Sequence, residues 1–450
     1  MKSINPYTGT IIEKHEEITD SAVEKIMEES SGAFRKWKRT GFGYRKPLMQ
    51  RAAELLQENN AEYAETITLE MGKPIRESRA EVDKCARVCE YYAENAERFL
   101  ESEPVETDAD ISYIAYEPLG VILGIMPWNF PFWQVFRFAV PTLMAGNSVL
   151  LKHASNVQIC AQKIENLFAR AGFPLSVFRN LSVGSDRMGK IISNDIIRGI
   201  SLTGSEAAGQ KVAGLAGSSL KKCVLELGGS NAFIVLEDAD IHGAVDTGIK
   251  ARFMNAGQSC IAAKRFILQK NISDKFLDLF TGGIKKLKAG DPMLDDTDIG
   301  PLVSVSQAAA VEEQLARSAA MGAKVICGGT RNGPFIEPAV VTDVTPGMPL
   351  FDEEVFGPVA AVTVAGDVSE AVALANRTGF GLGVSLFTGD VDRAGVLVCE
   401  FDDGAVFING LVKSDPRLPF GGTKRSGYGR ELAIQGIREF VNIQIQGIFQ

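Results

Sequence analysis

Apolar residues recur every three or four positions through most of the first hundred residues. Three segments show this spacing: AVEKIMEESSGAFRKWK, RKPLMQRAAELLQENNAEYAETITLEMG and ESRAEVDKCARVCEYYAENAERFL. This repeat places the apolar side chains along one face of a helix. The pattern therefore predicts that residues 18–100 are helical and that one face of each helix is buried.

The spacing changes after residue 100. Residues 101–120, ESEPVETDADISYIAYEPLG, contain prolines and then alternate, with Ile111, Tyr113 and Ala115 on one side. Alternation with a period of two is typical of a β-strand, so we expect a hairpin here. The final stretch, 438-REFVNIQIQGIFQ-450, alternates in the same way and is expected to form a pairing strand.

From residue 121 onwards, short apolar runs alternate with segments of helical spacing. The expected strands are VILGIMP, SVLLK, IRGISLTG and KCVLELGG, and the helices between them cover 134–145, 158–171 and SEAAGQKVAGLAG. A second series begins at NAFIVLED and continues through KRFILQK and helices at 241–256 and 305–322 to PAVVTDV and VAAVTVA. Strands that alternate with helices form parallel sheets, so we expect two α/β domains of similar design.

The composition is typical of a folded globular protein, with 45% hydrophobic and 23% charged residues in a chain of 450. This length predicts more than one domain. A net charge of -9 argues against a nucleic-acid-binding surface. No apolar run is long enough to span a membrane, and the N-terminus lacks the core of a signal peptide. We therefore expect no membrane partner and a cytoplasmic location.

Seven cysteines are scattered along the chain, and an odd, scattered set argues against a disulfide framework. Cys85 and Cys89 stand four residues apart without a second pair, so no metal site is expected. The only histidines are His15, His153 and His242. With so few histidines, a general base is expected to be a carboxylate.

Three polar residues stand in settings that favour chemistry. Cys260 follows small polar residues in 255-NAGQSCIAAKR-265, which let a backbone or a substrate come close, so it is either an ordinary structural cysteine or a reactive thiol. Glu226 ends an apolar strand in 226-ELGGSN-231, as either a solvated strand end or a base in a cleft. Asn129 lies between two prolines in 124-GIMPWNFPFWQVFR-137, as either a turn residue or an amide donor to an oxyanion.

The usual nucleotide-binding fingerprints, G-x-G-x-x-G and G-x-x-x-x-G-K-S/T, do not occur in this sequence. Instead, 203-TGSEAAG-209 follows an expected strand and opens an expected helix. Free N–H groups at such a helix start are able to bind a pyrophosphate. A simple tight turn explains the same glycines equally well.

Taken in order, the blocks PWNFP, LK-x-A, TGS, ELGG, GQSC, EEVFGP and PFGG resemble the aldehyde dehydrogenase superfamily over nearly the whole chain. The resemblance implies two Rossmann-like α/β domains and a β-hairpin oligomerisation arm. The cofactor-binding domain would cover 1–102 and 118–226, the catalytic domain 227–418, and the arm 103–117 and 438–450. The arm would pair subunits into a homodimer or homotetramer.

The family mechanism implies NAD(P)-dependent oxidation of a short-chain aldehyde. Cys260 would attack the aldehyde carbon, while Asn129 and the Cys260 N–H hold the oxyanion. After hydride transfer to the nicotinamide, Glu226 would activate the water that hydrolyses the thioester. Lys152 is implied to contact the adenosine ribose and Glu354 the nicotinamide ribose. Further cofactor contacts are implied for Met126, Pro127, Trp128, Ser155, Thr203, Gly204, Ser205, Leu227 and Phe356.

One departure from the family pattern concerns the cofactor. Many members read Lys-Pro-x-Glu where this chain reads 152-KHAS-155, so Ser155 replaces a carboxylate that grips the 2′-hydroxyl of NAD. Losing that carboxylate removes a repulsion against a 2′-phosphate. We therefore expect NADP to be preferred and NAD to be accepted as well.

The K-H-A form and the segment KKCVLELGGS resemble bacterial succinate-semialdehyde dehydrogenases, which makes succinate semialdehyde the expected substrate. The subgroup's substrate-anchoring arginine matches Arg137. A second arginine, often found six residues before the nucleophile, is replaced by Met254, and Arg417 is a candidate substitute. The alternatives are glutarate semialdehyde, lactaldehyde or glyceraldehyde as substrate, a non-catalytic protein on the same scaffold, and a cofactor-independent thiol hydrolase.

Overall fold

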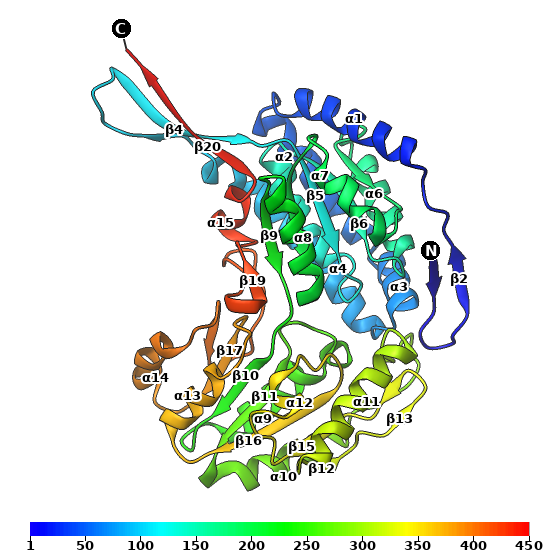
Figure 1. Cartoon of the computed structure of the whole chain (residues 1–450), viewed down its shortest axis with the longest axis vertical. Coiled ribbons are helices and arrows are strands. Elements are labelled where there is room, and N and C mark those ends of the chain that lie inside the picture. Colours follow the sequence, from blue (N-terminus) through cyan, green and yellow to red (C-terminus); the bar gives the residue numbers. More distant parts are fainter. Residues whose placement is uncertain (450) are drawn as a thin grey trace.

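The computed structural model of the chain describes residues 1–449. It contains two α/β bodies, one above the other in Figure 1, and a long β-sheet arm that projects from the first. Parallel sheets covered by helices form both bodies, as the sequence pattern predicts. Within residues 1–449, no helix is both long enough and apolar enough to cross a membrane.

A six-stranded sheet in the order β19-β9-β8-β5-β6-β7 forms the centre of the first body. Its strands are β5 (Val121–Met126), β6 (Ser148–His153), β7 (Phe178–Asn180), β8 (Ile197–Thr203), β9 (Lys222–Glu226) and β19 (Gly427–Tyr428). Strands β5 to β9 are parallel, whereas β19 joins β9 in the antiparallel sense. The carboxyl ends of β5 and β9 point toward the second body in Figure 1, which brings their final residues to the junction.

Helices pack on this sheet, and the predicted helical region 18–100 is confirmed as four of them. These are α1 (Asp20–Trp37), α2 (Phe42–Glu58), α3 (Asn60–Met71) and α4 (Ile75–Phe99), followed by α5 (Trp133–Met144), α6 (Gln158–Arg170), α7 (Met188–Ser193), α8 (Glu206–Ser218) and α15 (Ala433–Arg438). Helix α4 buries Val82, Cys85 and Cys89 against α2 and α5. A short hairpin, β1 (Lys2–Ile4) and β2 (Ile11–Lys14), precedes these helices and was not predicted.

The second body contains a seven-stranded sheet in the order β12-β15-β16-β11-β10-β17-β18, parallel except for β12. Its strands are β10 (Asn231–Val235), β11 (Ala263–Gln269), β12 (Lys324–Cys327), β15 (Ala339–Thr342), β16 (Val359–Ala365), β17 (Val384–Phe387) and β18 (Val406–Ile408), with a small hairpin of β13 (Arg331–Asn332) and β14 (Phe335–Ile336) outside it. Its helices are α9 (Ile241–Phe253), α10 (Ser273–Ile284), α11 (Val305–Ala320), α12 (Pro349–Asp352), α13 (Val368–Asn376) and α14 (Val391–Leu397).

The arm is a three-stranded antiparallel sheet of β3 (Glu103–Pro104), β4 (Ile111–Pro118) and β20 (Val441–Ile448). The register pairs Val441 with Pro118 at the base and Ile448 with Ile111 at the tip. Ile443 and Ile445 on β20 are exposed, 63% and 84%. The expected pairing of the two alternating segments is therefore present, although Gln450, the last residue of the expected arm, lies outside the described residues.

The chain passes between the two bodies at two places that lie side by side. It leaves the first body between β9 and β10 and returns after β18 to form β19. The two passages are joined by hydrogen bonds from the Leu227 N–H to the Ser426 carbonyl, 3.0 Å, and from Ser426 Oγ to the Gly228 carbonyl, 2.7 Å. Both passages therefore run next to Glu226.

Candidate active site

The loop that carries Cys260 has an unusual backbone. It follows α9, and Asn255 and Ala256 at its start have positive φ angles of 52° and 50°. Asparagine tolerates this left-handed region because its amide forms local hydrogen bonds, whereas alanine is strained there. The Asn255 amide donates to the carbonyls of Asn129, at 2.9 Å, and Gln258, at 3.1 Å. These bonds fix the loop against the turn that carries Asn129.

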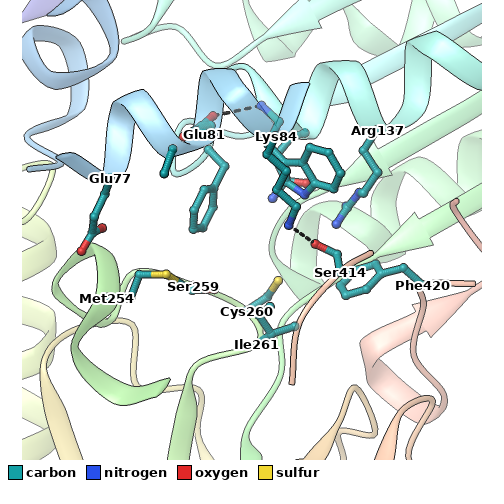
Figure 2. Close-up of a pocket in the computed structure, with 14 residues that line it drawn as sticks. Glu77, Glu81, Lys84, Arg137, Met254, Ser259, Cys260, Ile261, Ser414 and Phe420 are labelled. Carbon is teal, nitrogen blue, oxygen red and sulfur yellow. Dashed lines mark hydrogen bonds between the residues drawn. The ribbon is translucent and has the colours of Figure 1, made fainter. Parts of the chain in front are cut away.

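Cys260 lies where two cavities meet. The smaller cavity, about 170 Å³, extends from Cys260 to α4 and α5, and Figure 2 shows its lining side chains. The second cavity, about 350 Å³, is bounded by Trp128, Thr203, Glu354 and Phe356 and is also lined by Cys260. A thiol in this position is able to react with a molecule in one cavity while a second molecule occupies the other.

The surroundings of Cys260 decide its protonation state. Burial raises the pKa of the thiol to about 11, and the nearby cations of Arg137 and Lys264 act in the opposite direction. The thiol is therefore protonated at neutral pH in this state. A base, or a change in the surroundings when another molecule binds, is needed to form the thiolate nucleophile.

Glu226 is a buried carboxyl near this junction, although it lines neither of the two cavities. It is 2% exposed, and neither of its carboxylate oxygens has a hydrogen-bond partner among the described residues. Burial holds its pKa well above the usual range, with Arg137 opposing the shift and Glu431 adding to it. Gly421 of the PFGG block leaves room for it, because a Cβ there would lie 2.9 Å from Glu226 Oε1. The carboxyl is thus poised to exchange a proton rather than to form a permanent ion pair.

Asn129 lies in the turn after β5 and lines the larger cavity. Its side-chain amide donates one hydrogen bond, 3.1 Å, to the Gln258 carbonyl. A primary amide carries two N–H groups, so one remains to bind an oxygen atom in the cavity. This geometry is compatible with the expected oxyanion donor.

Arg137 and Arg417, the two predicted substrate-binding arginines, have different surroundings. The Arg137 side chain is fully buried and lines the smaller cavity, where it forms an ion pair with Glu431, donates to Thr203 Oγ1 at 3.2 Å and stacks over Phe420. Arg417 is 75% exposed, is bonded to Asp415 and lines a separate cavity that does not include Cys260. The structure thus brings Arg137, but not Arg417, to Cys260.

The larger cavity brings together eight of the eleven residues that are expected to contact the cofactor. It includes Pro127, Trp128, Thr203, Gly204, Ser205, Leu227, Glu354 and Phe356 of the expected cofactor residues. Gly228 lies so close to the Glu354 carboxylate that a Cβ at this position would collide with it. Ser205 caps α8 through the Ala208 N–H, 3.3 Å, so the start of that helix faces this region. Met126, by contrast, ends β5 and does not line this cavity.

Lys152 lies near the end of β6, and Ser155 lies in the turn that follows this strand. Burial lowers the pKa of Lys152, and the carboxylate of Glu17 acts in the opposite direction. Ser155 is exposed, and the N-cap of α6 is Val157, without a side-chain capping bond. Ser155 does not cap this helix and is free to contact another group.

Several residues of the site had no signal in the sequence. Lys84, Glu77 and Trp133 line the smaller cavity, and Lys264 donates hydrogen bonds to the carbonyls of Ser259 and Cys260. Lys84 and Glu77 belong to the amphipathic helix α4, in which charged residues are normal on any exposed face. Within residues 1–449, no cluster of three His, Cys, Asp or Glu side chains is arranged to hold a metal ion.

Two parallel α/β bodies with a cysteine between two cavities are compatible with an enzyme that uses a thiol nucleophile. The model of the aldehyde dehydrogenase family matches residues 1–445, and the chain belongs to this family. It is 46% identical over 448 residues, 98% of each chain, to a Mycobacterium tuberculosis protein named succinate-semialdehyde dehydrogenase (NADP(+)) 1. A Mycobacterium leprae protein named succinate-semialdehyde dehydrogenase (NADP(+)) is 45% identical over 448 residues, again 98% of each chain.

Proteins of known structure also share this fold. The succinic semialdehyde dehydrogenase of Streptococcus pyogenes, determined in complex with NADP+ as the cofactor, superposes with a TM-score of 0.97 and 37% identity, covering all of both chains. The predicted family, fold class and enzyme class are therefore confirmed, and the protein is an aldehyde dehydrogenase.

Proposed function

We propose that the protein oxidises succinate semialdehyde to succinate with NADP as the preferred cofactor and NAD as an alternative. The observation that carries the proposal is the position of Cys260 between a small cavity with cationic side chains and a larger crevice lined by glycine, hydroxyl and aromatic residues. The names of the mycobacterial and streptococcal relatives support the same substrate and cofactor.

Cys260 supplies the nucleophile. Once a base has taken the thiol proton, the thiolate sulfur adds to the aldehyde carbon, and the carbonyl oxygen of the substrate becomes the oxyanion of a thiohemiacetal. The free N–H of the Asn129 amide and the backbone N–H of Cys260 hold this oxyanion. A nicotinamide nucleotide, when bound, supplies the two-electron oxidation that converts the thiohemiacetal to a thioester.

Glu226 acts on the water that hydrolyses this thioester. Its raised pKa and its lack of a fixed hydrogen-bond partner suit a group that accepts a proton from water. The Cys260 thiol then leaves from the tetrahedral intermediate, which releases the carboxylic acid. The two residues approach the junction from different bodies, Glu226 on β9 and Cys260 before β11.

Most of the proposed cofactor residues line the larger cavity, and Lys152 and Ser155 lie at and just after the end of β6. Glu354 accepts a hydrogen bond from the Gly229 N–H, 3.1 Å, which holds its carboxylate at the cavity wall for a ribose hydroxyl. Trp128 and Phe356 pack edge to face, 5.7 Å between ring centroids, and form an apolar wall for the nicotinamide. Lys152 and Ser155 would contact the ribose and its 2′-phosphate, where Ser155 adds a donor and no negative charge.

The arm supports a proposal of self-association. Its strands carry exposed apolar side chains, among them Ile443 and Ile445, and the outer strand β3 is only two residues long. A sheet with an open edge and an apolar face is a ready surface for pairing with another subunit. We therefore assign residues 103–117 and the end of the chain to the contact of a homodimer or homotetramer, which light scattering of the purified protein tests.

A steady-state panel tests the proposed reaction. The purified enzyme is assayed with succinate semialdehyde, glutarate semialdehyde, lactaldehyde, glyceraldehyde and butanal, each with NADP and with NAD. The proposal requires succinate semialdehyde with NADP to give the highest kcat/KM. A higher kcat/KM for a neutral aldehyde would overturn the substrate, and a higher value with NAD would overturn the cofactor preference.

A further inference from the structure

We propose that Lys84 is the residue that binds the substrate carboxylate, with the Ser414 hydroxyl beside it. The inference rests on the proposed function, because it requires an aldehyde that carries a carboxylate. It places the anchor of the substrate on α4, a helix of the first body that carries none of the residues recognised from the sequence motifs.

The position of Lys84 follows from contacts on three elements. Lys84 Nζ donates to Ser414 Oγ at 2.6 Å and lies 4.0 Å from the centre of the Trp133 ring. Figure 2 shows its side chain extending from α4 toward the loop of Ser414, with Cys260 across the cavity from α4. Ser414, Trp133 and Cys260 all line the same cavity. An aldehyde held against the sulfur would therefore direct the rest of its short chain toward this ammonium group.

Arg137 is the other cation in the cavity, but its charge is already balanced. Its guanidinium forms an ion pair with the buried carboxylate of Glu431 and stacks over Phe420. Lys84 takes part in no ion pair among the described residues, and an ammonium carries three N–H donors. With one donor on Ser414 and one side against the face of Trp133, Lys84 still has donors for a carboxylate.

The acidic side chains of the cavity explain why the carboxylate goes to Lys84 rather than to the opposite end. Glu81 is occupied, because it pairs with Lys73 and accepts the N–H groups of Phe132 and Trp133 at 2.9 Å each. Glu77 lies at the other end and accepts the Asn255 N–H at 2.7 Å.

Glu77 lies beside Met254 in the cavity, as Figure 2 shows. Met254 stands at the position where succinate-semialdehyde dehydrogenases often have an arginine. Seven residues of helix separate Glu77 from Lys84, about 10 Å along α4. The basic end of the cavity attracts a substrate anion, and Glu77 at the other end, whose pKa burial raises to about 7, repels it once the carboxyl is ionised above that pH. Burial lowers the pKa of Lys84 to about 8, and Arg137 adds to this shift, so an anion bound beside Lys84 would favour its charged form.

The test compares Lys84→Met with wild type on two aldehydes of similar length, succinate semialdehyde and butanal. Losing one charge-assisted hydrogen bond should lower kcat/KM for succinate semialdehyde about 10- to 100-fold. The value for butanal should change less than about threefold, since butanal has no carboxylate to anchor. Lys84→Arg should recover part of the loss. Arg87→Met is the matched control, because it removes one cation from the same helix but faces a different cavity.

Inhibition by succinate gives a readout that does not depend on turnover of the semialdehyde. Succinate should inhibit butanal oxidation by the wild type in competition with butanal, and Lys84→Met should weaken this inhibition about tenfold or more. Lys84→Gln is assayed in parallel in case the Met variant does not fold, as judged by its thermal unfolding.

Each outcome decides between the two proposals. If succinate inhibits the wild type but the wild type does not oxidise succinate semialdehyde, the proposed function is overturned. If Lys84→Met also relieves that inhibition, the role of Lys84 as the carboxylate anchor is kept. Equal losses for both aldehydes, or no loss for either, overturn the anchor and leave the proposed function intact. A wild type that neither oxidises the semialdehyde nor binds succinate overturns both.

Discussion

The ammonium of Lys264 donates a hydrogen bond to the backbone carbonyl of Cys260 at 2.8 Å. The same buried group donates to the carbonyl of Ser259 and lies 3.3 Å from a carboxylate oxygen of Glu354. Lys264 therefore connects the nucleophile loop with the carboxylate that lines the larger cavity. Its positive charge also favours the thiolate form of Cys260.

Replacing Lys264 with Met should affect both properties. Two carbonyls and one carboxylate lose a buried donor, so the free energy of unfolding should fall by about 2–4 kcal/mol, measured in urea. Alkylation of Cys260 by iodoacetamide should become slower at a fixed pH because the pKa of the thiol rises. Lys285→Met, at an exposed site, is the control. An unchanged alkylation rate would show that Lys264 has no electrostatic influence on the thiol.

Cys260→Ser should abolish dehydrogenase turnover while cofactor binding persists. A serine hydroxyl is a far weaker nucleophile at neutral pH than a thiol that can ionise. Turnover is followed by the absorbance of the reduced cofactor, and binding by quenching of protein fluorescence. Cys399→Ser, which changes an exposed cysteine, should retain full activity. Substantial turnover by the Cys260 variant would rule out its role as the nucleophile.

Glu226→Gln should slow hydrolysis of the thioester more than its formation. The amide cannot accept a proton from water, and loss of a general base typically lowers a rate about 100-fold or more. Stopped-flow measurements should therefore show a burst of reduced cofactor close to one equivalent per active site, followed by slow turnover. Loss of the burst itself would mean that Glu226 acts before the thioester forms.

Ser155→Glu should shift the cofactor preference. A carboxylate at this exposed position would repel the 2′-phosphate of NADP, so its KM should rise about tenfold or more. The KM for NAD should change little, because NAD has no phosphate there. Both constants are measured at saturating aldehyde. If the two constants change by the same factor, Ser155 does not face the 2′-position.

The pH dependence of KM should differ between anionic and neutral aldehydes. The pKa of Lys84 is about 8, lowered by burial and by Arg137, while Cys85 and Glu81 raise it and Arg87 lowers it slightly. Below this pH the ammonium is charged and binds the carboxylate; above it, the free enzyme loses that charge.

The ratio of the KM for succinate semialdehyde to the KM for butanal should therefore be constant below about pH 7 and rise above about pH 8, up to tenfold per pH unit. Taking a ratio removes the titrations that both substrates share, including that of Cys260. Burial also raises the pKa of Glu77 to about 7, so the carboxylate that forms above this pH adds to the rise for the anionic substrate. Lys84→Arg should remove the rise that Lys84 causes and leave only the contribution of Glu77, because a guanidinium stays charged throughout this range. A ratio that stays flat in the wild type would mean that Lys84 does not titrate in this range or does not contact the substrate.

The parts of the site that the sequence predicts are those held by short local motifs. Cys260, Glu226 and Asn129 each stand in a block whose glycines or prolines shape the turn around them, and the structure brings all three blocks to one junction. Lys84 could not be predicted in this way. Its contact with Ser414 joins residues 330 positions apart, and only the packing of α4 against α5 reveals which face of the helix it occupies.

In the fold, too, the elements with a regular local pattern could be predicted, and the shorter ones could not. Helices α1 to α4 and the strands β5, β6 and β8 to β11 follow from regular apolar spacing. The strands β7 and β18 were not predicted, because runs of three residues are too short to show a period, and the four-residue β17 was missed as well. Arg417 was a candidate for substrate binding because it lies just before the PFGG block in the sequence. In the structure its exposed side chain bonds to Asp415 and lines a cavity that does not include Cys260.

The two neighbouring passages between the bodies make the second body an insertion within the first. Strand β19, contributed by residues 427–428, covers the outer edge of β9, the strand that ends in Glu226. A chain truncated before residue 427 would therefore keep every motif up to PFGG but leave this edge unpaired. Strand β19 thus makes residues 427–428 part of the sheet that holds the catalytic carboxyl, and neither body is a simple N- or C-terminal fragment of the chain.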